Sequence, residues 1–280
     1  MLTRFERLPV QEQAAIAGEP FDRWLTPDGG VAAEFHRTAD GYLLRFPEQA
    51  DFAISLDEMV VHGIPADHNG PLETLYRNAI LPVIGNHLGE LHMHGSAVVT
   101  PWGAIAFMGL SRRGKTTLAG AFAKAGYPFL TEDTVSLDKD GETYLLRPQR
   151  PVLRLFSDSA AHLLGHVAQD EDDDSKAELA AGEALPFASE PAPLRAIFLL
   201  GPGESDAVAI APLSEAEALT QLIQNAFVLD VEDKPRLRAH FGRIAALAGT
   251  VRCHALDYPR RYAQLPAVIE AICACVQEDS

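Results

Sequence analysis

The feature that most constrains this 280-residue chain is a glycine-rich segment that follows an apolar run. The segment Gly109-Leu-Ser-Arg-Arg-Gly114-Lys115-Thr116 satisfies the pattern G-x-x-x-x-G-K-[ST] at every defined position. Average residue usage produces this pattern by chance in about one chain of this length in a hundred. The apolar run Ala104–Met108 precedes it and an Ala- and Leu-rich run follows, so we expect a strand, a turn and a helix in that order. The segment therefore predicts a phosphate-binding loop.

Each defined position of this loop has a physical reason. Gly109 and Gly114 allow backbone dihedrals that turn successive N–H groups inward onto one phosphate. A helix that begins at Lys115 adds unpaired N–H groups and the positive end of its dipole. Lys115 would then reach the β- and γ-phosphates, and the Thr116 hydroxyl would bind Mg²⁺. The expected contacts to the nucleotide, taken as ATP, are Gly109, Ser111, Arg112, Arg113, Gly114, Lys115, Thr116 and Thr117.

Two of these residues, Arg112 and Arg113, are unusual in such a loop, where small side chains are common. They would fold over the nucleotide, contact a phosphorylated partner or face water. The sequence leaves these three interpretations open.

An acidic pair follows the next short apolar run, Phe129–Thr131, at 17 and 18 residues beyond Lys115. If that run is a strand beside the loop, Glu132 and Asp133 lie at its carboxyl end, where ligands bind in open α/β sheets. Such a pair can divide its roles, with one carboxylate holding Mg²⁺ and the other accepting a proton from an attacking hydroxyl. The alternative is a surface turn after a strand.

Two histidines, His92 and His94, lie upstream of the loop. In isolation such residues are usually structural, and two ligands alone do not make a zinc site. Because His94 comes before the strands that lead into the loop, we expect it to contact phosphate.

The rest of the chain divides at about residue 90. In residues 1–90, strand-like runs at 31–36, 42–46 and 52–56 are followed by a helical run, Leu72–Leu88, that Pro82 should kink. Residues 91–280 alternate strands and helices, which predicts an α/β core with crossover connections. Its other expected strands are 96–99, 129–131, 134–137, 144–146, 196–200, 208–210 and 251–256, and its expected helices are 116–125, 265–276 and one from a Ser214–Glu217 capping box to about Val228.

Composition excludes several classes of function. With 23 Lys and Arg against 39 Asp and Glu, the formal net charge is −16, so we expect no nucleic-acid partner. No apolar run is long enough for a membrane span. Residues 170–190 carry eight acidic side chains against Lys176 alone and are expected to form a solvated loop. Three cysteines and a start unlike a signal peptide favour a reduced, cytoplasmic protein.

The order of His94-Gly95, the glycine-rich loop and a strand ending in an acidic pair resembles the HPr kinase/phosphorylase family. Relatives of that family include kinases that modify lasso-peptide precursors. The segments Arg150-Pro-Val-Leu-Arg-Leu155 and Ser175-Lys176 are similar to further parts of the family pattern. Together the resemblance covers about residues 91–270. It implies an α/β fold with the P-loop core of the HPr kinase C-terminal domain, of phosphoenolpyruvate-carboxykinase-like type, beside a small N-terminal α+β region.

The resemblance also implies roles for single residues. Asp133 would be the base, Glu132 stands where the family usually has its first Asp, His94 would lie near the transferred phosphoryl group, and Lys176 would steady its charge. The chain has no counterpart of the Gly-Arg-Asn-containing C-terminal signature of the bifunctional enzymes, which favours a monofunctional kinase.

The predicted function is an ATP- and Mg²⁺-dependent kinase that phosphorylates a hydroxyl, with Ser expected, on a peptide or small protein. A lasso-type peptide-tailoring kinase is the first choice and an HPr-like kinase the second. Catalytic roles fall to Lys115, Glu132, Asp133 and His94, and Mg²⁺ binding to Thr116 and Glu132. The alternatives are a nucleotide-binding regulatory module without transfer activity and a kinase for a small metabolite. Residues 1–90 are a candidate region for substrate docking, and the resemblance leaves homo-oligomerisation open.

Overall fold

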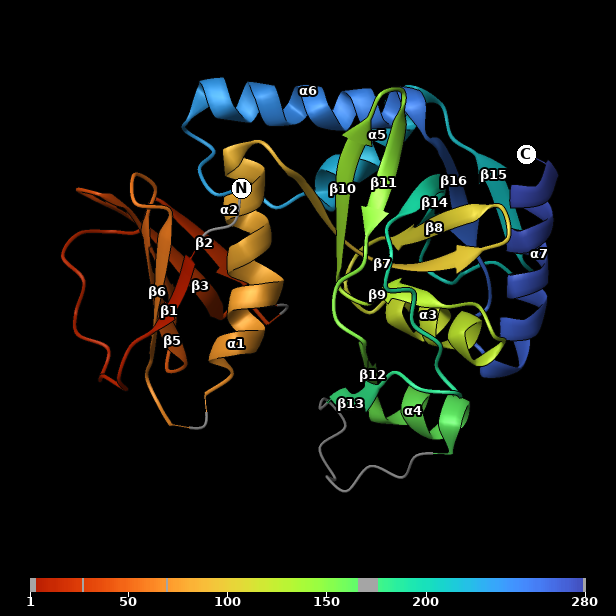
Figure 1. The fold of residues 1–280 in the computed structure, drawn as a ribbon, viewed down its shortest axis with the longest axis horizontal. Helices are drawn as coiled ribbons and strands as arrows, with labels where there is room; N and C mark the ends of the chain where they lie inside the picture. The colour runs from red at the N-terminus through yellow and green to blue at the C-terminus, as the bar shows by residue number, and fades with distance from the viewer. Residues whose placement is uncertain (1–3, 27, 69, 166–175, 279–280) are drawn as a thin grey trace. The chain divides into compact units, whose positions relative to one another are not determined.

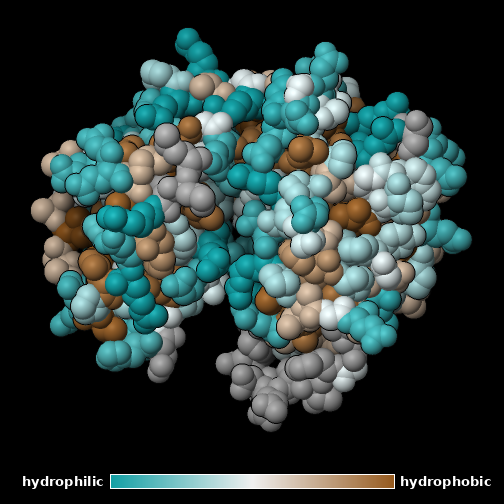
Figure 2. Space-filling model, in the orientation of Figure 1, coloured by the Kyte–Doolittle hydropathy of each residue, from teal (hydrophilic) through white to brown (hydrophobic). Residues whose placement is uncertain are grey.

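The computed structural model describes residues 4–26, 28–68, 70–165 and 176–278. The chain is of the mixed α/β class with several sheets, and it forms two compact units, Met1–Leu88 and Gly89–Ser280 (Figure 1). The face drawn in Figure 2 is mainly hydrophilic, with hydrophobic residues scattered over it. Within the described ranges, every helix is too short or too polar to cross a bilayer.

The first unit is a six-stranded sheet in the order β1-β6-β5-β4-β3-β2, with one helical segment. Only β1 and β6 pair in parallel; the other neighbours are antiparallel. Alternate residues of β4 are buried, which gives the sheet an apolar face, and Tyr42 on that face meets His87 of the helical segment edge to face. The strands are β1 (Arg4–Arg7), β2 (Asp22–Leu25), β3 (Val31–Thr38), β4 (Gly41–Phe46), β5 (Ala50–Ser55) and β6 (Val60–Pro65).

The helical segment responds to Pro82 with a change of helix type. It runs as α1 (Leu72–Leu75), the π-helical turn η1 (Tyr76–Ile80) and α2 (Leu81–Leu88). Proline has no N–H to donate to the carbonyl four residues earlier, and its ring crowds that carbonyl. A wider π turn directly before the proline relieves this crowding, so the expected disruption at Pro82 takes this form.

The second unit is built on a sheet in the order β11-β10-β7-β8-β14-β16-β15, with β9 paired to β7. β8, β14 and β16 are parallel to one another, and the other neighbours are antiparallel. The strands are β7 (Leu91–Thr100), β8 (Gly103–Met108), β9 (Phe129–Thr131), β10 (Thr134–Asp140), β11 (Thr143–Arg147), β14 (Ala192–Leu200), β15 (Ala209–Pro212) and β16 (Arg252–Asp257).

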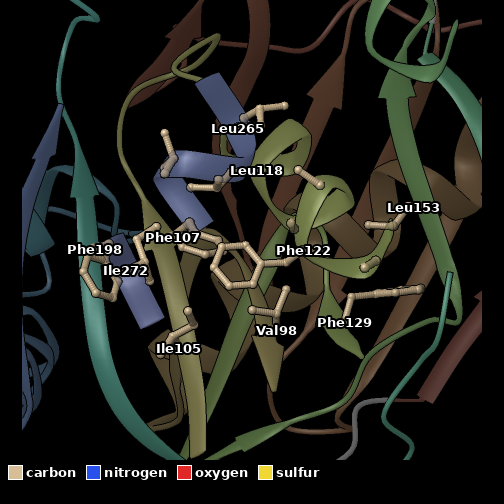
Figure 3. Close-up of a cluster of buried hydrophobic side chains, with 14 of the residues drawn as sticks. Val98, Ile105, Phe107, Leu118, Phe122, Phe129, Leu153, Phe198, Leu265 and Ile272 are labelled. Carbon is tan, nitrogen blue, oxygen red and sulfur yellow. The ribbon is translucent and has the colours of Figure 1, made fainter. Parts of the chain in front are cut away.

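Helices cover both faces of this sheet. On one face, α3 (Lys115–Lys124) and α7 (Leu265–Glu278) bury an apolar cluster in which the rings of Phe107 and Phe122 lie together (Figure 3). On the other face, α5 (Glu215–Gln224) and α6 (Lys234–Thr250) pack on alternate strand residues such as Ala106 and Met108. The remaining elements are β12 (Val152–Phe156), paired with β13 (Lys176–Ala180), α4 (Ser157–Leu164) and the 3₁₀ helix η2 (Tyr262–Gln264).

The strands and helices expected from the sequence are present, with ends shifted by a few residues, but two expectations about the helices are wrong. The helix that begins at the confirmed Ser214–Glu217 capping box ends at Gln224 instead of Val228, because Asn225 leaves the helix to bond β7. The whole of α6 was not expected. Residues 170–175 of the expected acidic loop, 170–190, lie outside the described residues, and the next five residues form the strand β13 instead of a loop.

Candidate functional site

The carboxyl ends of several strands meet at one edge of the second unit's sheet. Because β8, β14 and β16 are parallel, their ends at Met108, Leu200 and Asp257 lie side by side. β9 pairs antiparallel with β7, as β8 does, so Thr131 ends at the same edge. The glycine-rich loop therefore follows one strand of this edge and the acidic pair follows another, which is the expected place for a ligand.

The loop 109–116 owes its shape to three residues with positive φ. These are Gly109 at 145°, Arg112 at 62° and Gly114 at 87°. A Cβ at Gly109 would lie 3.0 Å from the carbonyl oxygen of Leu200, so this position is both strained and crowded for any other residue. Gly114 is the N-cap of α3, and the helix begins at Lys115 as the pattern predicts. A left-handed turn that leads into a helix N-terminus is favourable for binding an anion.

Lys115 lies folded against its own loop. Its Nζ donates to the carbonyl oxygens of Gly109 at 2.7 Å and Leu110 at 3.0 Å, and the residue is buried. Its own carbonyl oxygen accepts from Ser96 Oγ at 2.9 Å. One residue on, Thr116 Oγ1 donates to the carbonyl oxygen of Glu132 at 3.2 Å. These bonds tie the start of α3 to β7 and to the acidic pair.

Both carboxylates of the acidic pair contact Arg154 on β12. Arg154 Nε donates to Glu132 Oε1 at 2.5 Å, and Arg154 Nη2 lies 3.4 Å from Asp133 Oδ2. Burial opposes the charge of the guanidinium, but its hydrogen bond and its attraction to Glu132, with that to Asp133, raise the pKa of Arg154. The site therefore holds a compensated cluster of charges. Sequence analysis assigned no role to Arg154 itself, although the segment Arg150–Leu155 that contains it is similar to part of the family pattern.

His94 is brought to the acidic pair by the pairing of β7 with β10. Thr134 lies opposite His94 in the register, and the N–H of Gly95 donates to the carbonyl oxygen of Asp133 at 3.0 Å. His94 Nδ1 lies 3.6 Å from Asp133 Oδ1, and about a third of the His94 side chain is exposed. The two residues that the sequence selected independently are therefore neighbours.

A cavity of about 640 Å³ opens between these groups. Eight of the sequence-predicted residues line it, whereas Gly109, Arg113 and Glu132 are not among the described residues of its wall. Within the acidic pair, Asp133 belongs to the described cavity lining and Glu132 does not. The eight lining residues are His94, Ser111, Arg112, Gly114, Lys115, Thr116, Thr117 and Asp133.

The rest of the described cavity wall comes from segments to which sequence analysis gave no site residue. They are β12 with the start of α4, and the turn from Tyr258 to Tyr262 after β16. Over the described lining, five cationic side chains stand against two carboxylates, a formal excess of three positive charges in a chain of net charge −16. The cations are Arg112, Lys115, Arg154, Arg260 and Arg261, and the carboxylates are Asp133 and Asp158.

A chain of hydroxyl groups joins α3 to α4 and η2 at the cavity wall. Thr117 Oγ1 on α3 lies 3.0 Å from Ser159 Oγ on α4, and that oxygen lies 3.0 Å from the hydroxyl of Tyr262. The Tyr262 hydroxyl donates to Asp158 Oδ2 at 2.7 Å. Burial, followed by the interaction with Asp158, raises the pKa of Tyr262, although its contact with Ser159 opposes the shift. These contacts connect α3, α4 and η2 along the cavity wall.

Comparisons with known proteins give little more. No family model matches the chain, and no curated protein matches it in sequence. Among solved structures, the chain is similar to the Hpr(Ser) kinase/phosphatase from Coxiella burnetii, at 7% sequence identity and a TM-score of 0.39. That match covers 68% of this chain and 99% of the other. Likeness at this level assigns neither family nor activity.

Proposed function

We propose that the second unit is a P-loop kinase that binds ATP with Mg²⁺ and transfers the γ-phosphoryl group to a hydroxyl. The observation that carries the proposal is the single cavity that gathers Lys115, Thr116, the start of α3 and Asp133. Its volume of about 640 Å³ suits a nucleotide-sized ligand, and the excess of cations in its lining suits a triphosphate.

The proposed roles follow from where the side chains lie. Lys115 would exchange the carbonyl oxygens that it now contacts for β- and γ-phosphate oxygens. Asp133, which faces the cavity and has His94 at 3.6 Å, would accept the proton of the attacking hydroxyl. Arg154 would orient Asp133 and, with Lys115, offset charge on the transferred group. Catalysis of this kind is mostly positioning and charge neutralisation.

The residues at this edge also fit a magnesium ion. In nucleotide sites Mg²⁺ is held by one or two protein oxygens together with phosphate oxygens and water, and it offsets charge on the phosphates. Thr116 presents a hydroxyl at the cavity wall, and the carboxylate of Asp133 lies in the same wall. Glu132 stands behind them, in contact with Arg154, and would bind the ion after Arg154 shifts toward a phosphate.

The acceptor is proposed to be a Ser hydroxyl on a peptide or small protein, as in a lasso-type peptide-tailoring kinase or an HPr-like kinase. The sequence resemblance supports this choice. In addition, Met1–Leu88 forms a compact unit of its own, to which we assign acceptor docking.

The test uses the full chain with Mg²⁺ and γ-labelled ATP, offered to precursor-like peptides with Ser, to small proteins including HPr, and to hydroxylated metabolites. We expect label on a peptide or protein Ser. Lys115→Ala should abolish transfer and weaken ATP binding, whereas Lys124→Ala, an exposed position of the same helix, should change neither. Label on metabolites alone would contradict the proposed acceptor, and no ATP binding by the wild type would contradict the proposed function.

One observation favours a second candidate, a nucleotide-binding module without transfer activity. Arg154 contacts both Glu132 and Asp133, so the negative charge of the acidic pair is already offset by a side chain of the protein. Tight ATP binding without transfer to any acceptor would support this candidate. In that case the only effect of Asp133→Asn would be on ATP binding, because there would be no transfer to lose.

A further inference from the structure

Asn225, the residue at which α5 ends, bonds two separate parts of the candidate site. Each of its four polar atoms has a partner, and the residue is 6% exposed. Its N–H donates to the carbonyl of Leu222 at 3.0 Å, and its Nδ2 to that of Gln221 at 2.9 Å. Its Oδ1 accepts from the N–H of Gly109 at 2.9 Å, and its carbonyl oxygen accepts from the N–H of His94 at 2.7 Å.

These partners allow only one orientation of the Asn225 amide. A flipped amide would point its donor at the N–H of Gly109 and its acceptor at the carbonyl of Gln221. Because a buried polar group without a partner destabilises the fold, the observed orientation is strongly preferred. The side chain therefore serves as a fixed link of defined length between the end of α5 and the first residue of the loop.

The residues after Asn225 hold His94 in a second way. Ala226 pairs with Met93 as an isolated antiparallel bridge. The ring of Phe227 meets the ring of His94 edge to face, with centroids 6.2 Å apart. The segment 225–227 thus fixes both the backbone and the ring of His94.

The contact with Gly109 has a consequence for the loop. Since the N–H of Gly109 is bonded to Asn225, it does not serve as a phosphate contact in this arrangement, which agrees with the absence of Gly109 from the described cavity lining. Asn225 instead fixes where the loop begins, while Ser96 fixes where it ends through the carbonyl of Lys115.

We propose that Asn225 is a positioning residue that sets His94 and the phosphate-binding loop at a fixed distance from each other. Its kinetic consequence rests on the proposed kinase function, whereas its structural consequence does not. β7 and β8 pair as far as Gly95 and Met108, so the side chain of Asn225 acts on the next residue, Gly109, and its removal would let the loop beyond this pair shift relative to His94 and Asp133. Misplacement of reacting groups by about 1 Å lowers turnover by about 100-fold.

The kinetic test compares a variant that keeps the hydrogen bond to the N–H of Gly109 with one that loses it. Asn225→Ala loses both side-chain bonds, and kcat should fall about 10- to 100-fold. Asn225→Asp keeps an acceptor for Gly109 but sets a second oxygen against the carbonyl of Gln221. It should therefore have the lower Tm of the two and yet the higher kcat at saturating ATP. A merely structural residue would give kcat values that follow Tm. Gln224→Ala, an exposed neighbour, is the control and should match the wild type.

The structural test measures amide hydrogen exchange at Gly109 by NMR in nucleotide-free protein. Exchange should be faster in Asn225→Ala than in the wild type, and close to the wild type in Asn225→Asp and Gln224→Ala. If Asn225→Ala does not fold, Asn225→Asp alone decides by its Gly109 protection. Unchanged exchange in Asn225→Ala, or loss of protection in Asn225→Asp, would overturn the proposal. If the wild type transfers no phosphate, the proposed function fails, while this measurement still decides the role of Asn225.

Discussion

Two histidines that stand two residues apart on β7 have opposite surroundings. The His92 side chain is 5% exposed, with Nε2 at 2.7 Å from Glu90 Oε2 and Nδ1 at 2.8 Å from Ser136 Oγ. The His94 side chain is 35% exposed, lines the cavity and contacts Asp133 at the longer distance of 3.6 Å. A histidine that serves chemistry needs access and a partner that can still tighten when a ligand binds, and only His94 meets both conditions.

The surroundings of His92 show that the residue types of a catalytic triad, even when hydrogen-bonded in order, do not by themselves make an active site. Ser136, His92 and Glu90 are bonded in the order of a nucleophile, a base and an acid. Yet Ser136 is 1% exposed, and its Oγ also accepts from Gln149 Nε2 at 2.9 Å. No substrate reaches this hydroxyl, so the three residues stabilise the junction of β7 and β10.

The largest expected difference in activity lies between the oxygen-bearing partners of the two histidines, Asp133 beside His94 and Ser136 beside His92. Asp133→Asn should lower kcat about 10²- to 10⁴-fold, because it removes the proposed base without changing the side chain's shape. Ser136→Ala, a comparable change beside His92, should leave kcat unchanged. Steady-state transfer assays on both variants measure the contrast. Near-wild-type turnover in Asp133→Asn would show that Asp133 is not the base.

The histidines themselves should separate activity from stability. His94→Gln should lower kcat about tenfold or more with little change in Tm, because the ring stands at the cavity wall. His92→Ala should cost about 3 kcal/mol of unfolding free energy, because it empties a buried position and leaves the partly buried Glu90 without its closest partner. Chemical denaturation and transfer assays on both variants provide the measurements. The contrast between the two histidines is wrong if both variants lose activity in proportion to their stability.

Much of the site follows from the sequence because its signals are local. The loop pattern needs only eight consecutive residues, and the acidic pair needs only a strand ending, so both Lys115 and Asp133 are predicted from the sequence, and both line one cavity. The contacts of Arg154 and Asn225 with the site were missed for a common reason. Their contacts join residues 22 and 116 positions apart, and no pattern within one segment announces such a pairing.

The fold shows the same limit. Strands and helices with a simple period were found, but α6 was not, although Asp233 caps it and Pro235 stands in its first turn. Its first half is mostly exposed and rich in arginine, so the apolar period is visible only from Leu237 onward. The sequence predicts a kink at Pro82, whereas the structure has a π turn before it. Propensity indicates where a helix is disturbed, but packing determines the form that the disturbance takes.

The smallest expected effect concerns a third histidine, His240 of α6, which is buried as His92 is. Burial, then the nearby charges of Arg243 and His92, lower the pKa of His240 from 6.5 to about 4. The unfolded chain therefore binds a proton between these values that the folded protein does not. Stability should fall as the pH drops from about 6.5, by about 2 kcal/mol at pH 5.

The acidic neighbour of His92 acts in a different pH range, which allows the two effects to be separated. The hydrogen bond to His92, opposed by burial, lowers the pKa of Glu90 below its ordinary value of 4.5, so its contribution is present above that pH and is lost only below it. Unfolding free energies of the wild type and His240→Leu, measured between pH 7 and pH 5, therefore report on His240. The wild type should lose about 2 kcal/mol relative to the variant, whereas exposed His68→Gln should show the wild-type profile. Parallel profiles for the wild type and His240→Leu would mean that His240 takes up its proton in the folded protein without loss of stability. The surroundings of His240 would then be as accessible to water as the cavity beside His94.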